Sequence, residues 1–125
     1  MRVLIDTHVL LWTLREPDRL RPSAKAVLAD PAIVTVVSAV VVWEIAIKQS
    51  LGKLRAPEDL MAVLRTTDHE ILAIQAADVW RVRDLPPHHG DPFDRLLIAQ
   101  AQVENLPILT HDSVFERYDV QVIRA

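Results

Sequence analysis

The chain has 125 residues, half of them apolar, so we expect residues 1–125 to form a single domain with a substantial hydrophobic core. It has no cysteine and only two glycines, which excludes disulfides and thiolate chemistry and argues against the glycine-rich loops that bind nucleotide cofactors. The net charge of −3 permits a nucleic-acid partner without supporting one, and no apolar run approaches the roughly 20 residues of a membrane span, so we expect a cytoplasmic protein with no membrane contact.

The first half of the chain is expected to alternate between strands and helices. Hydrophobic periodicity predicts, in chain order, a strand, two helices, a second strand and a long helix over Arg2–Asp6, Thr7–Leu14, Ala24–Asp30, Ile33–Val37 and Ala39–Leu51. Ser23 is the expected N-cap of the second helix. Ser38 is that of the long helix, which Gly52 ends.

The second half continues the alternation. The pattern predicts helices over Pro57–Arg65, Gln75–Asp84, Pro92–Asn105 and Ser113–Tyr118, strands over Pro107–Thr110 and Val120–Ile123, and a short strand or an extended linker over Glu70–Ile74. Two prolines and a glycine make Leu85–Gly90 a loop. Because strands alternate with helices, we expect a three-layer α/β/α domain with a mostly parallel central sheet.

Two aspartates lie at the carboxyl ends of predicted strands. Asp6 comes after Val3-Leu4-Ile5, and Asp112 comes shortly after Ile108-Leu109-Thr110. Ligands of open parallel sheets bind outside the carboxyl ends of the strands, so these two side chains are candidates for one site. The alternative for each is a turn residue or a helix cap.

Glu44 is the one charged residue in the apolar run from Ala39 to Ile47. A helix that is apolar all round is largely buried, and an unpaired buried carboxylate is costly. The alternative is an i,i+4 pair with Lys48, worth only about 0.2–0.5 kcal/mol. We therefore favour a functional role for Glu44.

Asp91 and Asp94 flank Pro92-Phe93 at the start of a helix. One aspartate suffices as an N-cap, and Asp91 before a proline is suited to that position. Helical spacing places Asp94 on the apolar stripe of Leu97 and Ile98, toward the sheet. We expect Asp94 to join Asp6, Glu44 and Asp112.

Four converging carboxylates repel one another unless they are protonated, hydrogen-bonded or bound to a cation. Oxygen ligands select hard ions, so Mg²⁺ or Mn²⁺ is the expected cofactor. Zinc would require histidine, for which His8 is the nearby candidate.

These motifs together resemble PIN-domain proteins of the VapC toxin type. The resemblance covers nearly the whole chain and rests on the order of four segments: Asp6-Thr7-His8-Val9-Leu10-Leu11-Trp12, Ser38 with Trp43-Glu44-Ile45-Ala46-Ile47-Lys48, His89-Gly90-Asp91-Pro92-Phe93-Asp94-Arg95, and Thr110-His111-Asp112. It implies an α/β/α nuclease whose acidic cluster is Asp6, Glu44, Asp94 and Asp112. Thr110 matches an accompanying hydroxyl, and Asp91 falls within a motif and would assist.

The resemblance further implies an endoribonuclease that depends on Mg²⁺ or Mn²⁺, leaves 5′-phosphate and 3′-hydroxyl ends, and is a homodimer inhibited by a cognate antitoxin. Alternatives are a PIN-type nuclease for RNA processing or DNA, and a non-catalytic regulatory module with an acidic pocket. Lys48 and Arg95 are candidates for gripping the RNA substrate, or else pair with neighbouring acids. His88 and His89 are expected in a solvated loop or bonded to the helix cap. The tryptophans are expected in the core, or at a dimer or antitoxin surface.

Overall fold

The computed structural model describes all 125 residues and contains a five-stranded sheet in which every neighbouring pair is parallel. The strands are β1 (Arg2–Ile5), β2 (Val34–Ser38), β3 (His69–Leu72), β4 (Ile108–Thr110) and β5 (Val122–Arg124), in the spatial order β3-β2-β1-β4-β5. The expected parallel sheet is thus confirmed. The carboxyl ends of β1 and β4, which precede two candidate acids, are adjacent.

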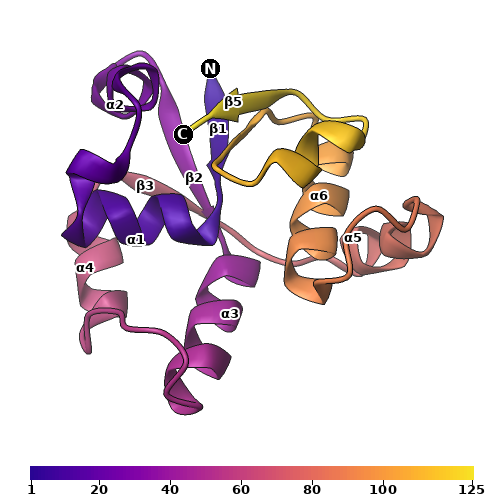
Figure 1. The fold of residues 1–125 in the computed structure, drawn as a ribbon, viewed down its shortest axis with the longest axis horizontal. Coiled ribbons are helices and arrows are strands. Elements are labelled where there is room, and N and C mark those ends of the chain that lie inside the picture. The colour runs from indigo at the N-terminus through magenta and orange to yellow at the C-terminus, as the bar shows by residue number, and fades with distance from the viewer.

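Helices cover both faces of the sheet (Figure 1). They are α1 (Thr7–Arg15), α2 (Pro22–Ala29), α3 (Ala39–Ser50), α4 (Leu60–Thr66), α5 (Ala76–Arg81) and α6 (Pro92–Glu104), with 3₁₀ turns η1 (Pro17–Arg19), η2 (Val82–Asp84) and η3 (Ser113–Arg117). α1, α2 and α4 lie on one side, α5 and α6 on the other, and α3 extends from the end of β2. None of these helices has the length and apolarity that a membrane span requires.

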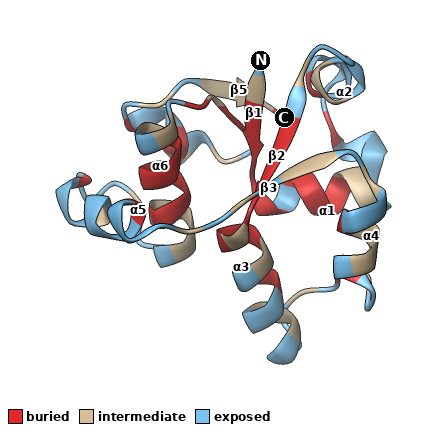
Figure 2. Ribbon diagram, turned by 180° about the vertical axis from the view of Figure 1, so that it is seen from behind, coloured by how far each residue is buried: buried red, intermediate tan, exposed pale blue.

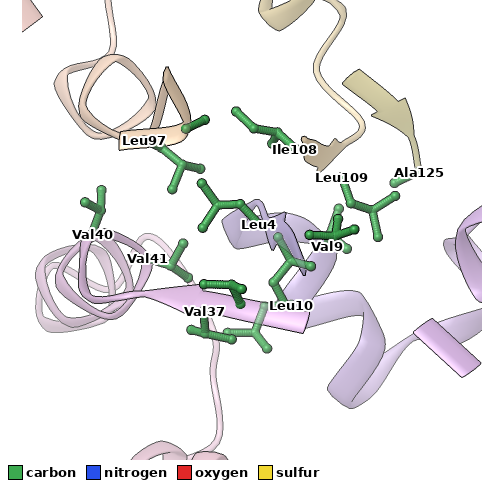
Figure 3. Packing of buried hydrophobic residues seen from close by; sticks show 14 of the residues in the cluster. Leu4, Val9, Leu10, Val37, Val40, Val41, Leu97, Ile108, Leu109 and Ala125 are labelled. Carbon is green, nitrogen blue, oxygen red and sulfur yellow. The ribbon is translucent and has the colours of Figure 1, made fainter. Parts of the chain in front are cut away.

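The core lies between the sheet and the helices that begin at its carboxyl edge. In Figure 3, Leu4 and Leu109 of adjacent strands pack near Val9 of α1, and Leu97 of α6 approaches the same sheet. These side chains are almost wholly buried, and each stabilises the fold by about 1.5–3 kcal/mol. Figure 2 shows that α3 is buried mainly at the end nearer the sheet. The helix starts are therefore fixed rigidly at this edge.

Some predicted boundaries are wrong, for local reasons. α2 begins at Pro22 with Arg21 as its N-cap, and Ser23 lies inside it, because the fixed φ of proline suits the first helical turn. α4 begins three residues after Pro57, since Pro57–Asp59 form a turn. The predicted helix Gln75–Asp84 is α5 followed by η2.

The open question about Glu70–Ile74 is resolved in favour of a strand up to Leu72, because β3 pairs with β2 at the sheet edge, while Ala73 and Ile74 follow the strand. The last strand begins two residues later than predicted. Core packing is correct for Trp12 but wrong for Trp43 and Trp80, which are 46% and 67% exposed. No other element covers α3 and α5 fully at these two positions, so both side chains stay partly exposed to solvent.

Candidate metal centre

Three of the candidate acids are helix N-caps and pocket residues at once. Asp6, Asp91 and Asp112 cap α1, α6 and η3. In each, Oδ1 accepts a hydrogen bond from a backbone N–H of its own helix, at 2.7, 2.8 and 2.9 Å respectively. Oδ2 is left for contacts outside the helix. The two alternatives raised by the sequence, cap or site, are therefore compatible.

The remaining two acids project from within helices. Glu44 lies in the second turn of α3, is buried, and accepts hydrogen bonds from the Thr7 hydroxyl and the Lys48 ammonium. Asp94 lies in the first turn of α6. Because α1, α3 and α6 all start at the carboxyl edge of the sheet, their first turns converge, and the positive ends of their dipoles favour negative charge there.

The five carboxylates line one open pocket of about 520 Å³. Lys48 and Arg19 are the only lysine or arginine that share this lining. Thr110 is buried beside it, donates from its hydroxyl to Asp6 Oδ2 at 2.7 Å, and accepts from the Asp112 backbone N–H at 3.0 Å. The candidate hydroxyl thus couples the acids that follow β1 and β4.

The charges in the pocket repel one another. Burial, followed by the fields of Asp6, Asp91, Glu44 and Asp112, raises the pKa of Asp94 to about 8. Burial also raises the pKa of Asp6, although hydrogen bonds from Thr110 and the Thr7 N–H oppose this. Burial disfavours the Lys48 ammonium, but its bond to Glu44 and the nearby acids outweigh that effect and raise the pKa of Lys48. The pocket therefore gathers five acids against two cations, Lys48 and Arg19.

His89 joins two of the acids, which the sequence did not indicate. Its largely buried ring places Nε2 2.9 Å from Asp112 Oδ2 and 3.0 Å from Asp94 Oδ2. Its Nδ1 accepts from the Asp91 backbone N–H at 3.1 Å, so the expected bond to the helix cap is present for His89, while His88 is exposed in the expected solvated loop. A histidine two residues before a cap is a weak signal by itself, because its partner Asp112 is 23 residues away.

The bond from Asp91 determines the tautomer of His89. A backbone N–H can only donate, so Nδ1 must accept, and a neutral ring then carries its proton on Nε2. Nε2 is consequently the hydrogen-bond donor to Asp112, and Asp94 Oδ2 lies close to the same N–H group. In this tautomer Nε2 has no lone pair for a metal, and the candidate ligands are oxygen atoms alone.

The two candidate cations differ in position. Lys48 lines the pocket, is paired with Glu44, and approaches Asp91 Oδ2 at 3.8 Å. Arg95 lies outside the pocket lining and pairs with no acid. Its guanidinium instead donates to four backbone carbonyls between Val82 and His89, the shortest being Pro86 at 3.0 Å. Arg95 therefore braces the loop that carries His89.

This arrangement fits a hard divalent cation. Carboxylates from four separate segments share a pocket. Burial and then repulsion by the neighbouring acids disfavour the charged form of Asp94, and a bound cation would favour it. Oxygen donors are the ligands that Mg²⁺ and Mn²⁺ prefer. The carboxylates of Asp6, Glu44, Asp94 and Asp112 are positioned to hold such an ion.

A profile of the PIN domain matches residues 3–121. Among solved structures, a chain of VapBC2 from Rickettsia felis, bound to promoter DNA, is 16% identical with a TM-score of 0.74 over 99% of this chain and 98% of that one. A chain of FitAcB from Neisseria gonorrhoeae is 21% identical, with a TM-score of 0.63 over 98% and 96%. A chain of VapBC-5 from Mycobacterium tuberculosis, of the VapBC toxin–antitoxin family, is 19% identical, with a TM-score of 0.65 over 99% and 98%. At these identities the likeness shows a shared fold. No curated protein matches the sequence significantly.

Proposed function

This chain belongs to the PIN-domain family, and on that premise we propose that it is a metal-dependent endoribonuclease acting as the toxin of a toxin–antitoxin pair. The observation that carries the proposal is the pocket lined by five carboxylates, in which burial, followed by the charges of the neighbouring acids, raises the pKa of Asp94 to about 8. Mutually repelling acids cost stability, so the chain has a reason to keep them only where a cation and a reaction use them.

Asp6, Glu44, Asp94 and Asp112 would hold Mg²⁺ or Mn²⁺. When bound, such an ion lowers the pKa of a water molecule and neutralises charge that develops on a phosphodiester. The protein's own contribution is orientation. Thr110 and Thr7 hold the carboxylates of Asp6 and Glu44 by hydrogen bonds.

Two further side chains support the carboxylates. His89 donates from Nε2–H to Asp112, and the same nitrogen lies beside Asp94 Oδ2. Lys48 lies at the pocket lining with an ammonium group that can contact a phosphate once an ion has satisfied Glu44.

The proposal includes protein partners, namely a cognate antitoxin and a second copy of the chain. The VapBC family of the neighbour from Mycobacterium tuberculosis is named as a toxin–antitoxin system. Trp43 and Ile47 of α3 and Leu51, its C-cap, lie four residues apart and are all exposed, which provides apolar surface for protein contact. Sedimentation of the chain alone should give the mass of a dimer. A monomer at micromolar concentration would contradict that part of the proposal.

The test incubates purified, antitoxin-free protein with total cellular RNA and, separately, with single-stranded and duplex DNA. Mg²⁺, Mn²⁺ and chelator are compared. We expect RNA cleavage only with a divalent ion, with 5′-phosphate and 3′-hydroxyl ends, and none from Asp94→Asn protein. Cleavage in chelator, or cleavage of DNA alone, would contradict the proposal.

A further inference from the structure

Two hollows continue from the acidic pocket along the end of α1. The first, of about 470 Å³, shares His8 and Trp12 with the acidic pocket. The second, of about 620 Å³, shares Arg15, Leu54 and Arg55 with the first. We call these two hollows the cationic trough. Because neighbouring hollows share lining residues, the trough and the acidic pocket form one continuous depression.

The trough gathers cations that have no partner in the protein. Arg15, Lys53 and Arg55 line it, all three are exposed, and none takes part in an ion pair or a side-chain hydrogen bond. The acids in the same lining are Glu16, which pairs with Arg19 at 3.4 Å, and Glu58 in the second hollow. In a chain of net charge −3, this concentration of unpaired cations is a local reversal of sign.

Aromatic rings lie where the acidic pocket meets the trough. His8 and His111 are exposed and approach the Trp12 ring, with centroid distances of 6.1 and 5.1 Å. The Arg19 guanidinium lies 4.5 Å from the centre of the same ring. Exposed rings beside a cationic groove are the features that bind single-stranded nucleic acid, because bases stack on the rings while phosphates contact the cations.

We infer that the cationic trough binds the single-stranded RNA that flanks the cleaved phosphodiester, with Arg15, Lys53 and Arg55 contacting its phosphates and His8 and His111 its bases. The inference rests on the proposed function and extends it by giving the substrate a path. The acidic pocket repels a polyanion, so affinity for RNA must come from cations outside it. The trough supplies them next to the reacting position.

The test compares two double variants that each remove two unpaired cations. Arg15→Ala/Arg55→Ala alters the trough. Arg21→Ala/Arg117→Ala is the matched control, because both residues are exposed and unpaired and neither lines a pocket. Binding of a fluorescent single-stranded RNA is measured by anisotropy in the Asp94→Asn background, across salt concentrations, so that binding is separated from cleavage.

Each lost phosphate contact lowers the magnitude of the slope of log affinity against log salt by about 0.7. The trough variant loses two contacts, so its slope should be smaller by about 1.4, and it should bind RNA about 20-fold more weakly at 0.1 M salt. The control should change less than twofold. In the active background, KM should rise for the trough variant while kcat holds.

Equal behaviour of the two double variants would overturn the trough while leaving RNA cleavage by the unaltered protein intact. Loss of antitoxin binding with unchanged RNA affinity would assign the trough to a protein partner and overturn it as well. Failure of the unaltered protein to cleave any RNA would instead be the failure of the proposed function, since binding is measured separately.

Discussion

Two regions of the molecule remove carboxylates from water in contrasting ways. In the acidic pocket, Asp6, Glu44 and Asp94 line the same wall. Of these three acids, Glu44 forms an ion pair with Lys48. In α5, Asp78 is buried and held by amide groups: its Oδ2 accepts from the Gln75 N–H at 2.8 Å and from the Gln100 amide at 3.3 Å. The second arrangement holds elements together. The acidic pocket instead brings carboxylates that repel one another close together, which is expected of a site that binds a cation.

Gln100 shows how the structural cluster works. Its side chain is wholly buried, accepts from the Ser38 hydroxyl, and donates to the Ala73 carbonyl at 3.0 Å as well as to Asp78. It therefore ties α6 to the first residue before α3 and to the segment between β3 and α5. The contrast predicts that substitutions in the two regions will respond differently to metal.

The largest expected effect is on catalysis. Asp94→Asn should lower RNA cleavage by about 10³-fold or more, the scale on which loss of one charge-stabilising group acts in an active site. At pH 9, where Asp94 is ionised, the same change should raise the melting temperature of the metal-free protein, because it removes a buried and repelled charge. Cleavage assays and thermal melts in chelator measure both. Asp68→Asn, at an exposed acid, is the control, and a lower melting temperature for Asp94→Asn would make Asp94 a structural acid.

A second prediction concerns pH. The pKa of Asp94 is about 8 in the folded chain against 3.8 for the free side chain, so the folded state binds more protons between these values. The associated stability is present below about pH 4 and is lost as the pH rises through about 8, amounting to a few kcal/mol at the order-of-magnitude level. Asp6 contributes with the same sign.

Urea unfolding at pH 5, 7 and 9 in chelator measures this dependence. Millimolar Mg²⁺ should flatten it and raise the melting temperature, because only the folded state gathers the carboxylates. Asp94→Asn should flatten it without metal. If the unaltered protein and Asp94→Asn show the same dependence of stability on pH, Asp94 does not have the raised pKa assigned to it.

A third prediction tests the structural cluster. Gln100→Ala leaves a cavity and unpaired polar groups around Ser38 and Asp78, so it should destabilise the fold by about 2–4 kcal/mol. The loss should be the same with Mg²⁺ as with chelator. Chemical denaturation in both conditions provides the measurement, with Gln121→Ala at an exposed position as the control. A loss that appears only with metal would place Gln100 in the metal centre.

The smallest effect sharpens the role of His89. His89→Ala should weaken Mn²⁺ binding by about 10-fold, the lower end of the range for partners of metal ligands. His89→Gln should lose less, because its amide can donate where Nε2–H does. Calorimetric titration measures the affinities, and the ¹⁵N shifts of the His89 ring report the tautomer. A proton on Nδ1 would contradict the assignment of His89 as a donor.

The gathering of the acids in one pocket was largely predictable from the sequence, because it depends on short-range rules. Asp6 and Asp112 follow strands, Glu44 interrupts an apolar helix, and Asp94 lies on a buried stripe. In a parallel sheet, such positions must meet at one edge. Asp91 was also identified correctly as an N-cap from its place before Pro92.

The sequence by itself determined the elements, their parallel arrangement and the acids at the carboxyl edge, since these follow from periods of two and 3.6 residues and from cap chemistry. The tertiary structure alone decided which atoms meet across long separations: the His89 ring with Asp112, the Arg95 guanidinium with the loop carbonyls, and the exposure of Trp43. Those contacts depend on how a loop is directed and on which helix face is left uncovered. Both result from the packing of the whole chain, which local spacing does not specify.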